Sequence, residues 1–249
     1  MSHDCKGDMC MDAECMTTDS PALEEKIIQG CACGKPKHRF VYDPLPHKYY
    51  LDGKEINGVS RCSELCGLSR EFNKQAEQGA AGGTNSHSWF AVWDRGEMDK
   101  YEPEGSALNG IEEWKQMRAA FGIERYEAIE EGAFMYARFG EEGIHVAGTG
   151  DRVYVAGPKH PMWPEGTRVY QDAKTSRDTP KPSKLYRFKC ALYRRIFNCK
   201  ASELVYIRHV GTFDPRPIRE GGSMDFHTST WDDEIVDKAL EFILWRRIG

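Results

Sequence analysis

The sequence predicts an α/β fold in which a mixed central β-sheet is flanked by helices. Segments that alternate apolar and polar residues, as strands do, lie mainly between residues 133 and 175, whereas segments with helical periodicity precede and follow them. At 249 residues, 40% of them hydrophobic, the chain is long enough for one substantial core. We therefore expect a single domain over residues 31–249, preceded by an acidic, mobile segment over residues 1–30.

The N-terminal part of the chain supports this division. Residues 1–30 hold four Asp and three Glu against two Lys, and their only periodicity predicts a short helix at residues 21–29. From Arg39 onward, alternation around Asp52-Gly53 predicts a β-hairpin with a tight turn. Helical patterns follow at residues 61–78 and, after the break GAAGG, in a segment that Thr84 or Ser86 can cap.

The rest of the chain alternates between the two kinds of element. A helix is expected at residues 111–122, strands at 133–139, 146–156 and 167–175, a helix at 181–200, a strand at 203–211 and a helix at 230–247. The last helix carries its acidic residues first and its basic residues last, in agreement with the helix dipole. The strands in the middle therefore form the expected sheet.

Two acidic residues, Asp151 and Asp172, each lie in a short apolar segment. The chain between them suits two strands and a turn-rich loop, so a hairpin would place the carboxylates side by side, and alternation puts Lys174 on the same face as Asp172. Two close carboxylates repel unless one is protonated or a cation lies between them, and Mg²⁺ is the usual cation for oxygen ligands. A lysine there can orient or deprotonate a water and stabilise charge on phosphorus, which is the chemistry of phosphodiester hydrolysis.

Five residues, in four segments and in the same order, resemble those of the PD-(D/E)XK nuclease superfamily, in particular its RecB-like branch and the related phage-type exonucleases. The sequence GTNSH, ending at His87, is similar to the branch's G-T-x-x-H stretch, and Glu131 stands before a strand as the family's glutamate does. The sequence AGTGDRV contains Asp151 and is similar to A-G-T-x-D. The sequence QDAKTS contains Asp172 and Lys174 and is similar to D-x-K-T/S.

This resemblance implies a restriction-endonuclease-like core and a metal-dependent deoxyribonuclease. It implies one or two Mg²⁺ or Mn²⁺ ions held by Asp151, Asp172, Glu131 and His87, with Lys174 as the catalytic lysine; Glu130 is the alternative to Glu131. The chain departs from the branch at Lys189, four residues before Tyr193, where relatives commonly carry glutamine. It has no cysteine after Cys199, so the iron–sulfur cluster of some relatives is not expected.

We expect an exonuclease that acts on linear DNA ends in phage or bacterial replication, repair or recombination. A structure-specific or nicking endonuclease and a non-catalytic DNA-binding or regulatory protein on a nuclease fold remain alternatives. DNA is the expected partner, with a single-strand annealing or replication protein as a second candidate; cleavage polarity, strand preference and oligomeric state stay open. Basic residues on one arc of the helix at 181–200 are expected to contact the DNA backbone: Lys184, Arg187, Lys189, Arg194 and Arg195.

Cysteine usage and charge indicate the compartment. Nine cysteines in a chain that begins without the pattern of a signal peptide are expected to be reduced thiols or metal ligands, and we expect a cytoplasmic protein, in the host cell if phage-encoded, with no membrane span. The net charge of −5 argues against a general polyanion binder. Cys31, Cys33 and His38, joined by one of Cys5, Cys10 or Cys15, are candidate ligands of Zn²⁺.

Overall fold

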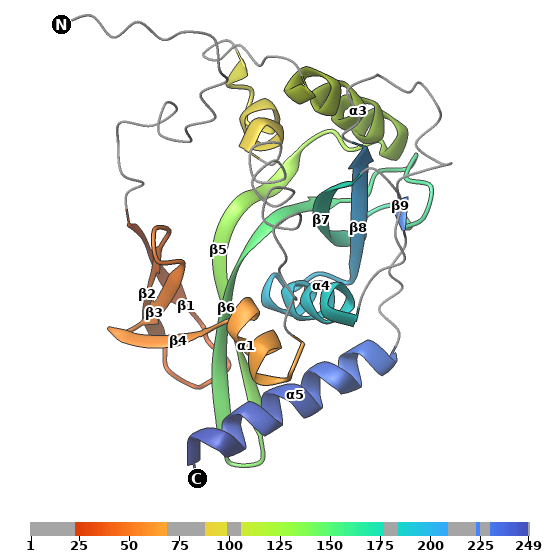
Figure 1. Ribbon diagram of the computed structural model, residues 1–249. Coiled ribbons are helices and arrows are strands. Elements are labelled where there is room, and N and C mark those ends of the chain that lie inside the picture. Colours follow the sequence, from red (N-terminus) through yellow and green to blue (C-terminus); the bar gives the residue numbers. More distant parts are fainter. Residues whose placement is uncertain are drawn as a thin grey trace, which may run out of the picture.

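The computed structural model describes residues 23–68, 88–98, 106–176, 184–208, 223–224 and 230–248. Nine strands among these residues form one mixed sheet in the order β1-β2-β3-β4-β6-β7-β8-β9, with β5 paired to β6. Helices flank this sheet, so the predicted α/β fold with a mixed central sheet is confirmed (Figure 1). The elements are β1 (Glu24–Gln29), β2 (Lys37–Asp43), β3 (Lys48–Leu51), β4 (Lys54–Gly58), α1 (Val59–Leu65), α3 (Ser106–Phe121), β5 (Tyr126–Phe139), β6 (Glu142–Val155), β7 (Arg168–Ser176), α4 (Lys184–Ile196), β8 (Ala201–Arg208), β9 (Ser223–Met224) and α5 (Thr230–Ile248).

The first strand, β1, replaces the short helix that the sequence predicts at residues 21–29. Residues 24–29 form β1, not a helix, and pair antiparallel with β2 from Glu24↔Tyr42 to Gln29↔Lys37. Long-range pairing overrides the local helical pattern here, because Ile28 packs against the apolar cluster around Phe40 and the backbone of β1 is satisfied by β2. The sheet therefore includes residues 24–29 of the segment that the sequence assigned to a mobile tail.

Strands β1 to β4 form an antiparallel meander that lies beside the long strands β5 and β6 (Figure 1). The predicted hairpin turn at Asp52-Gly53 is confirmed, with φ values of 52° and 81°, the left-handed region that a two-residue turn between β3 and β4 requires. β4 then pairs in parallel with β6 through only Asn57↔Val146 and Gly58↔Ala147. The meander is thus joined to the central sheet by a short ladder.

The central sheet contains the predicted hairpin. β5, β6 and β7 are successively antiparallel, and α4 connects β7 to β8, which runs parallel to β7. The strands predicted at 133–139, 146–156 and 167–175 correspond to β5, β6 and β7, although β5 begins earlier, at Tyr126. The predicted helix at 61–78 is shorter than expected: α1 ends at Leu65, and residues 69–78 lie outside the described part of the chain.

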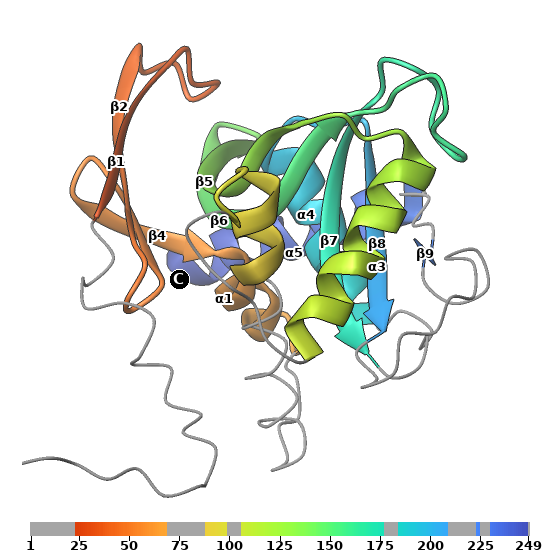
Figure 2. The ribbon, with the colours of Figure 1, turned by 90° about the horizontal axis from the view of Figure 1, so that it is seen from above.

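Helices cover both faces of this sheet (Figure 2). α1, α4 and α5 pack on one face around Leu192 and Leu240, and α3 with the helical segment at residues 88–94 packs on the other around Phe90 and Trp114. These four side chains are fully buried. Among the described residues, no helix combines the length and the apolar character that crossing a membrane requires.

Candidate active site

Three acidic residues occupy one row across β5, β6 and β7. The paired residues Ile129↔Arg152 and Glu131↔Gly150 bracket Glu130 and Asp151, which are therefore opposite each other. The β6–β7 ladder stops at Arg152↔Gln171, and Asp151 and Asp172 are the next residues in register. The row thus lies where the ladder between β6 and β7 ends.

Asp151, Asp172 and Lys174 meet at this point, as the sequence predicts. Oδ2 of Asp151 accepts a hydrogen bond from the backbone N–H of Ala173 at 3.0 Å, in place of a ladder bond. Nζ of Lys174 donates to Oδ1 of Asp172 at 2.5 Å and lies 3.9 Å from Oδ2 of Asp151. The ammonium group of Lys174 therefore lies within 3.9 Å of both carboxylates.

Burial shapes the charges of this group. Asp172 is 4% exposed, and burial raises its pKa to about 7; Lys174 opposes this shift and Asp151 adds to it. Burial alone would lower the pKa of Lys174, but Asp172 and Asp151 outweigh it, so the pKa lies above its ordinary value and the amine stays protonated. The carboxylates carry more negative charge than one lysine neutralises, which favours an added cation.

Helix α4 covers the site from one side. The ring of Tyr193 stacks on that of Tyr170 at 5.1 Å between centroids, and Sγ of Cys190 lies 4.0 Å from Oδ2 of Asp172. This close approach depends on the glycines of the AGTGD segment: a Cβ at Gly148 would lie 2.4 Å from the ring of Tyr193. The segment therefore has a packing function beside the carboxylate that it carries.

The structure places Glu130, and not the predicted Glu131, next to Asp151. Glu131 forms an ion pair with Lys26 of β1, and its side chain is 44% exposed. Burial raises the pKa of Glu130; Arg152 and Arg95 oppose this shift, and Asp151 contributes to it. The physical reason for the exchange is the backbone at Glu130, whose φ of 51° interrupts the alternation of β5.

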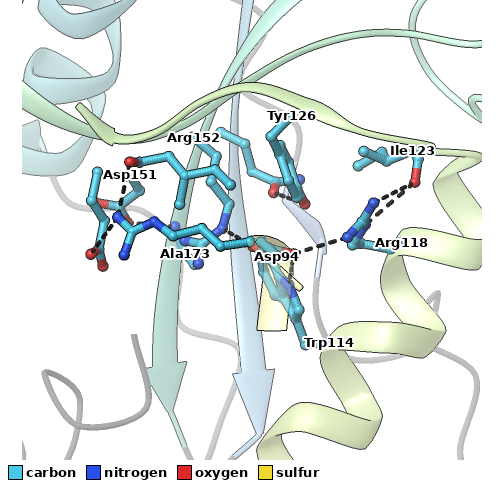
Figure 3. Close-up of polar contacts among 12 residues, drawn as sticks. Asp94, Trp114, Arg118, Ile123, Tyr126, Asp151, Arg152 and Ala173 are labelled. Carbon is cyan, nitrogen blue, oxygen red and sulfur yellow. Dashed lines mark hydrogen bonds and ion pairs between the residues drawn. The ribbon is translucent and has the colours of Figure 1, made fainter. Parts of the chain in front are cut away.

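A buried network supports the row from the face that α3 covers. Oδ2 of Asp94 accepts from Nε of Arg152 at 2.5 Å, and Oδ1 accepts from Trp114 at 2.9 Å and Arg118 at 3.1 Å. Figure 3 shows Asp94 between Arg152 on one side and Trp114 and Arg118 on the other. Because the side chains of Asp94 and Arg152 are fully buried, this pair fixes β6 at the residue that follows Asp151.

Sequence reasoning missed this network. Asp94 is a single acidic residue at the end of a predicted helix, and Arg152 is a single basic residue in an apolar strand. The only signal was the presence of a charged residue, Arg152, in a strand that pairs on both sides, since such a residue requires a buried partner.

Two of the predicted DNA-binding residues are engaged elsewhere. Arg194 forms an ion pair with Asp233 of α5. Arg195 contacts Asp233 at 3.2 Å and Asp237 at 2.5 Å. These contacts give both arginines a role in holding α4 against α5, and we therefore expect neither of them to bind DNA.

The other residues of the basic arc have different surroundings. Nζ of Lys189 donates to Oγ of Ser60 at 3.2 Å. Ser60 also lines a pocket of about 200 Å³, together with His47, Tyr49 and Tyr193. Lys184 is exposed at the start of α4, and Arg187 is half-buried. His87 lies outside the described residues, and so do Cys5, Cys10 and Cys15.

A second group of side chains could hold a metal ion. Cys31, Cys33 and His38 lie together as the sequence predicts, and the fourth member is His145 of β6. Their candidate ligand atoms all lie within 4.8 Å of one another. Sequence spacing could not identify His145, because more than a hundred residues separate it from Cys31.

Comparisons with known proteins add little to this geometry. No protein-family model matches the chain, and no curated protein matches it. Among solved structures, it is similar to the crystal structure of SSO0001, with a TM-score of 0.38 and 15% sequence identity over 77% of this chain and 78% of that one. A likeness at this level carries no argument about function.

Proposed function

We propose that this protein is a metal-dependent DNA nuclease that hydrolyses phosphodiester bonds. The observation that carries the proposal is the position of Asp151, Asp172 and Lys174: two carboxylates on adjacent strands, with one ammonium within 3.9 Å of both. The resemblance of the segments that contain these residues to the PD-(D/E)XK superfamily supports the same activity. We also propose that the mixed sheet and its flanking helices form a restriction-endonuclease-like core.

The donor set fits Mg²⁺ or Mn²⁺. Asp151 and Asp172 would hold the ion through carboxylate oxygens, with Glu130 next to them in the row. Their mutual repulsion, which contributes to the raised pKa of Asp172, is relieved when a divalent cation binds. A bound ion would supply Lewis acidity toward a phosphate oxygen and lower the pKa of a water.

Lys174 would orient the attacking water and stabilise negative charge on the phosphorus oxygens. Its raised pKa keeps Nζ protonated, so it acts as a hydrogen-bond donor and a positive charge. The backbone N–H of Ala173 holds Asp151, and α4 excludes water from the buried side of Asp172. These contacts fix the donors before the substrate binds.

The substrate class that we propose is the end of linear DNA, as the resemblance to the phage-type exonucleases implies. A structure-specific or nicking endonuclease would use the same residues. A covalently closed circle separates the two activities, because it offers no end.

The test compares cleavage of end-labelled linear duplex, single-stranded DNA and a closed circle with Mg²⁺, with Mn²⁺ and with EDTA. We expect linear DNA alone to be degraded, only with metal, and Asp172→Ala and Lys174→Ala to be inactive. Asp237→Ala and Lys115→Ala are matched controls, since both remove an exposed, paired charge outside the site. Cleavage of circles would favour the endonuclease, and binding without cleavage under any metal would overturn the catalytic proposal.

A further inference from the structure

The loop between β1 and β2 brings two thiols against two imidazoles. Sγ of Cys33 lies 3.0 Å from Nε2 of His38, and Sγ of Cys31 lies 3.8 Å from Nε2 of His145. In a tetrahedral zinc site with Zn–S of about 2.3 Å and Zn–N of about 2.0 Å, sulfur and nitrogen ligands are about 3.5 Å apart. These separations therefore bracket the spacing that zinc requires.

From this geometry we propose a structural zinc site whose ligands are Cys31, Cys33, His38 and His145. Two thiolates with two imidazoles form a donor set that favours Zn²⁺ over Mg²⁺ or Ca²⁺. Four protein ligands complete a tetrahedron, so no position is left for a substrate or a catalytic water. This inference does not depend on the proposed nuclease activity, since no residue of the carboxylate row takes part in it.

The surroundings of the four ligands are those of a metal site. Nδ1 of His38 lies 2.6 Å from Oδ2 of Asp52, which directs Nε2 toward the thiols, as carboxylates do behind zinc-binding histidines. Asp52 is itself held by the backbone N–H of Arg39 at 2.9 Å and by Nζ of Lys35 at 2.7 Å. The backbone N–H of Cys33 donates to Sγ of Cys31 at 3.5 Å, an interaction that favours the thiolate.

A catalytic triad is the competing explanation of part of this cluster. Cys33, His38 and Asp52 form a chain of contacts in the order of a nucleophile, a base and an orienting carboxylate. That explanation assigns nothing to Cys31 or His145, whereas a zinc site uses both. The imidazoles of His38 and His145 also lie close, with centroids 5.3 Å apart.

The zinc would fasten the meander to the central sheet. Cys31 and Cys33 belong to the β1–β2 loop and His38 to β2, whereas His145 belongs to β6. Because β4 and β6 share only two residue pairs, the metal would reinforce the junction between these parts. Binding energy of this kind contributes directly to folding.

Zinc content of the full chain, expressed with added zinc and without a histidine tag, tests the proposal. We expect about one zinc per wild-type molecule, the stoichiometry of one four-ligand site. The same content is expected in Cys66→Ser, a half-buried thiol outside the cluster, and in the double variant Asp151→Asn, Asp172→Asn. Cys33→Ser and His145→Asn should lose most of the zinc while circular dichroism confirms that they are folded.

A cobalt titration of the wild type keeps the proposal falsifiable if those variants do not fold. Co²⁺ bound by two thiolates should give a thiolate charge-transfer band and the visible bands of a tetrahedral ion, which carboxylates do not produce. Wild-type protein with neither zinc nor this spectrum would overturn the proposal. So would zinc that stays in His145→Asn, zinc lost from the aspartate double variant, a Cys31–Cys33 disulfide, or rapid alkylation of Cys33 in the metal-loaded chain.

Discussion

The carboxylate row and the Cys/His cluster differ in the chemistry of their donor atoms and in whether they leave a coordination position for a substrate. The Cys/His cluster consists of Cys31, Cys33, His38 and His145. The row offers only carboxylate oxygens and lies beside a lysine that is 27% exposed at the end of a ladder. The cluster offers sulfur and nitrogen, and its four candidate donor atoms lie within 4.8 Å of one another. Hard oxygen donors suit Mg²⁺, which keeps waters for a substrate to displace, whereas soft donors suit a closed zinc site. One chain thus holds the elements of a catalytic and of a structural metal site.

The largest effect that separates the two regions is on the cleavage rate. Asp172→Ala or Lys174→Ala should reduce cleavage by about 1,000-fold or more, because each removes a group that acts on the reacting phosphate. Cys33→Ser should change the rate per folded molecule by less than about threefold, since the cluster is remote from the chemistry. Initial rates at saturating Mg²⁺ measure both. A comparable loss in Cys33→Ser would break the division between the regions.

The next effect is on stability, and it is expected for the Cys/His cluster and not for the carboxylate row. His145→Asn should lower the free energy of unfolding by about 3 kcal/mol, a midpoint shift of about 6–12 °C for a chain of this size, because the zinc ligation is lost. Cys66→Ser should shift the midpoint far less. Thermal unfolding followed by circular dichroism, with and without a zinc chelator, gives the comparison. Equal midpoints for wild type and His145→Asn would contradict the assigned role.

Separate substitution of the two neighbouring glutamates tests which of them belongs to the carboxylate row. Glu130→Gln should reduce cleavage by about 10- to 100-fold, the usual cost of removing a group that holds a metal ion or orients one of its ligands. Glu131→Gln should reduce it by less than about threefold, because it removes only a partly exposed ion pair with Lys26. Rates measured against Mg²⁺ concentration distinguish a loss of metal affinity from a loss of rate. The reverse order of effects would restore Glu131 as the third carboxylate.

The smallest effect is on DNA binding and concerns two basic residues of α4, Lys189 and Arg195. Lys189→Ala should raise the dissociation constant for DNA severalfold and reduce the slope of log affinity against log salt by about one, as the loss of one phosphate contact does. Arg195→Ala should leave that slope unchanged and lower the unfolding midpoint by a few degrees at most, because its ion pairs with α5 are partly exposed. Binding of a labelled oligonucleotide at several salt concentrations measures the slope. An unchanged slope in Lys189→Ala would place the DNA elsewhere.

Much of the central sheet was predictable because its signals are local. The hairpin of β6 and β7 follows from two alternating segments and the loop between them, and this hairpin brings Asp151, Asp172 and Lys174 together. The turn at Asp52-Gly53 was predictable for the same reason, since its residues tolerate positive φ.

The remaining features depend on contacts that periodicity does not encode. β1 needs β2 as its partner, and His145 reaches the Cys/His cluster only after β6 is placed in the sheet. The positive φ of Glu130 interrupts the alternation of β5, so that Glu130, and not the predicted Glu131, lies next to Asp151. Arg194 and Arg195 belong to a basic arc in the sequence, but in the structure they form ion pairs with acidic residues of α5.

The most direct test of this account is to locate metals in crystals grown with zinc and soaked in Mn²⁺, by anomalous scattering at the absorption edges of both elements. The account predicts a zinc peak enclosed by Cys31, Cys33, His38 and His145, and a manganese peak between Asp151 and Asp172. Manganese in the cluster, zinc restricted to the carboxylates, or no metal at either place would contradict it.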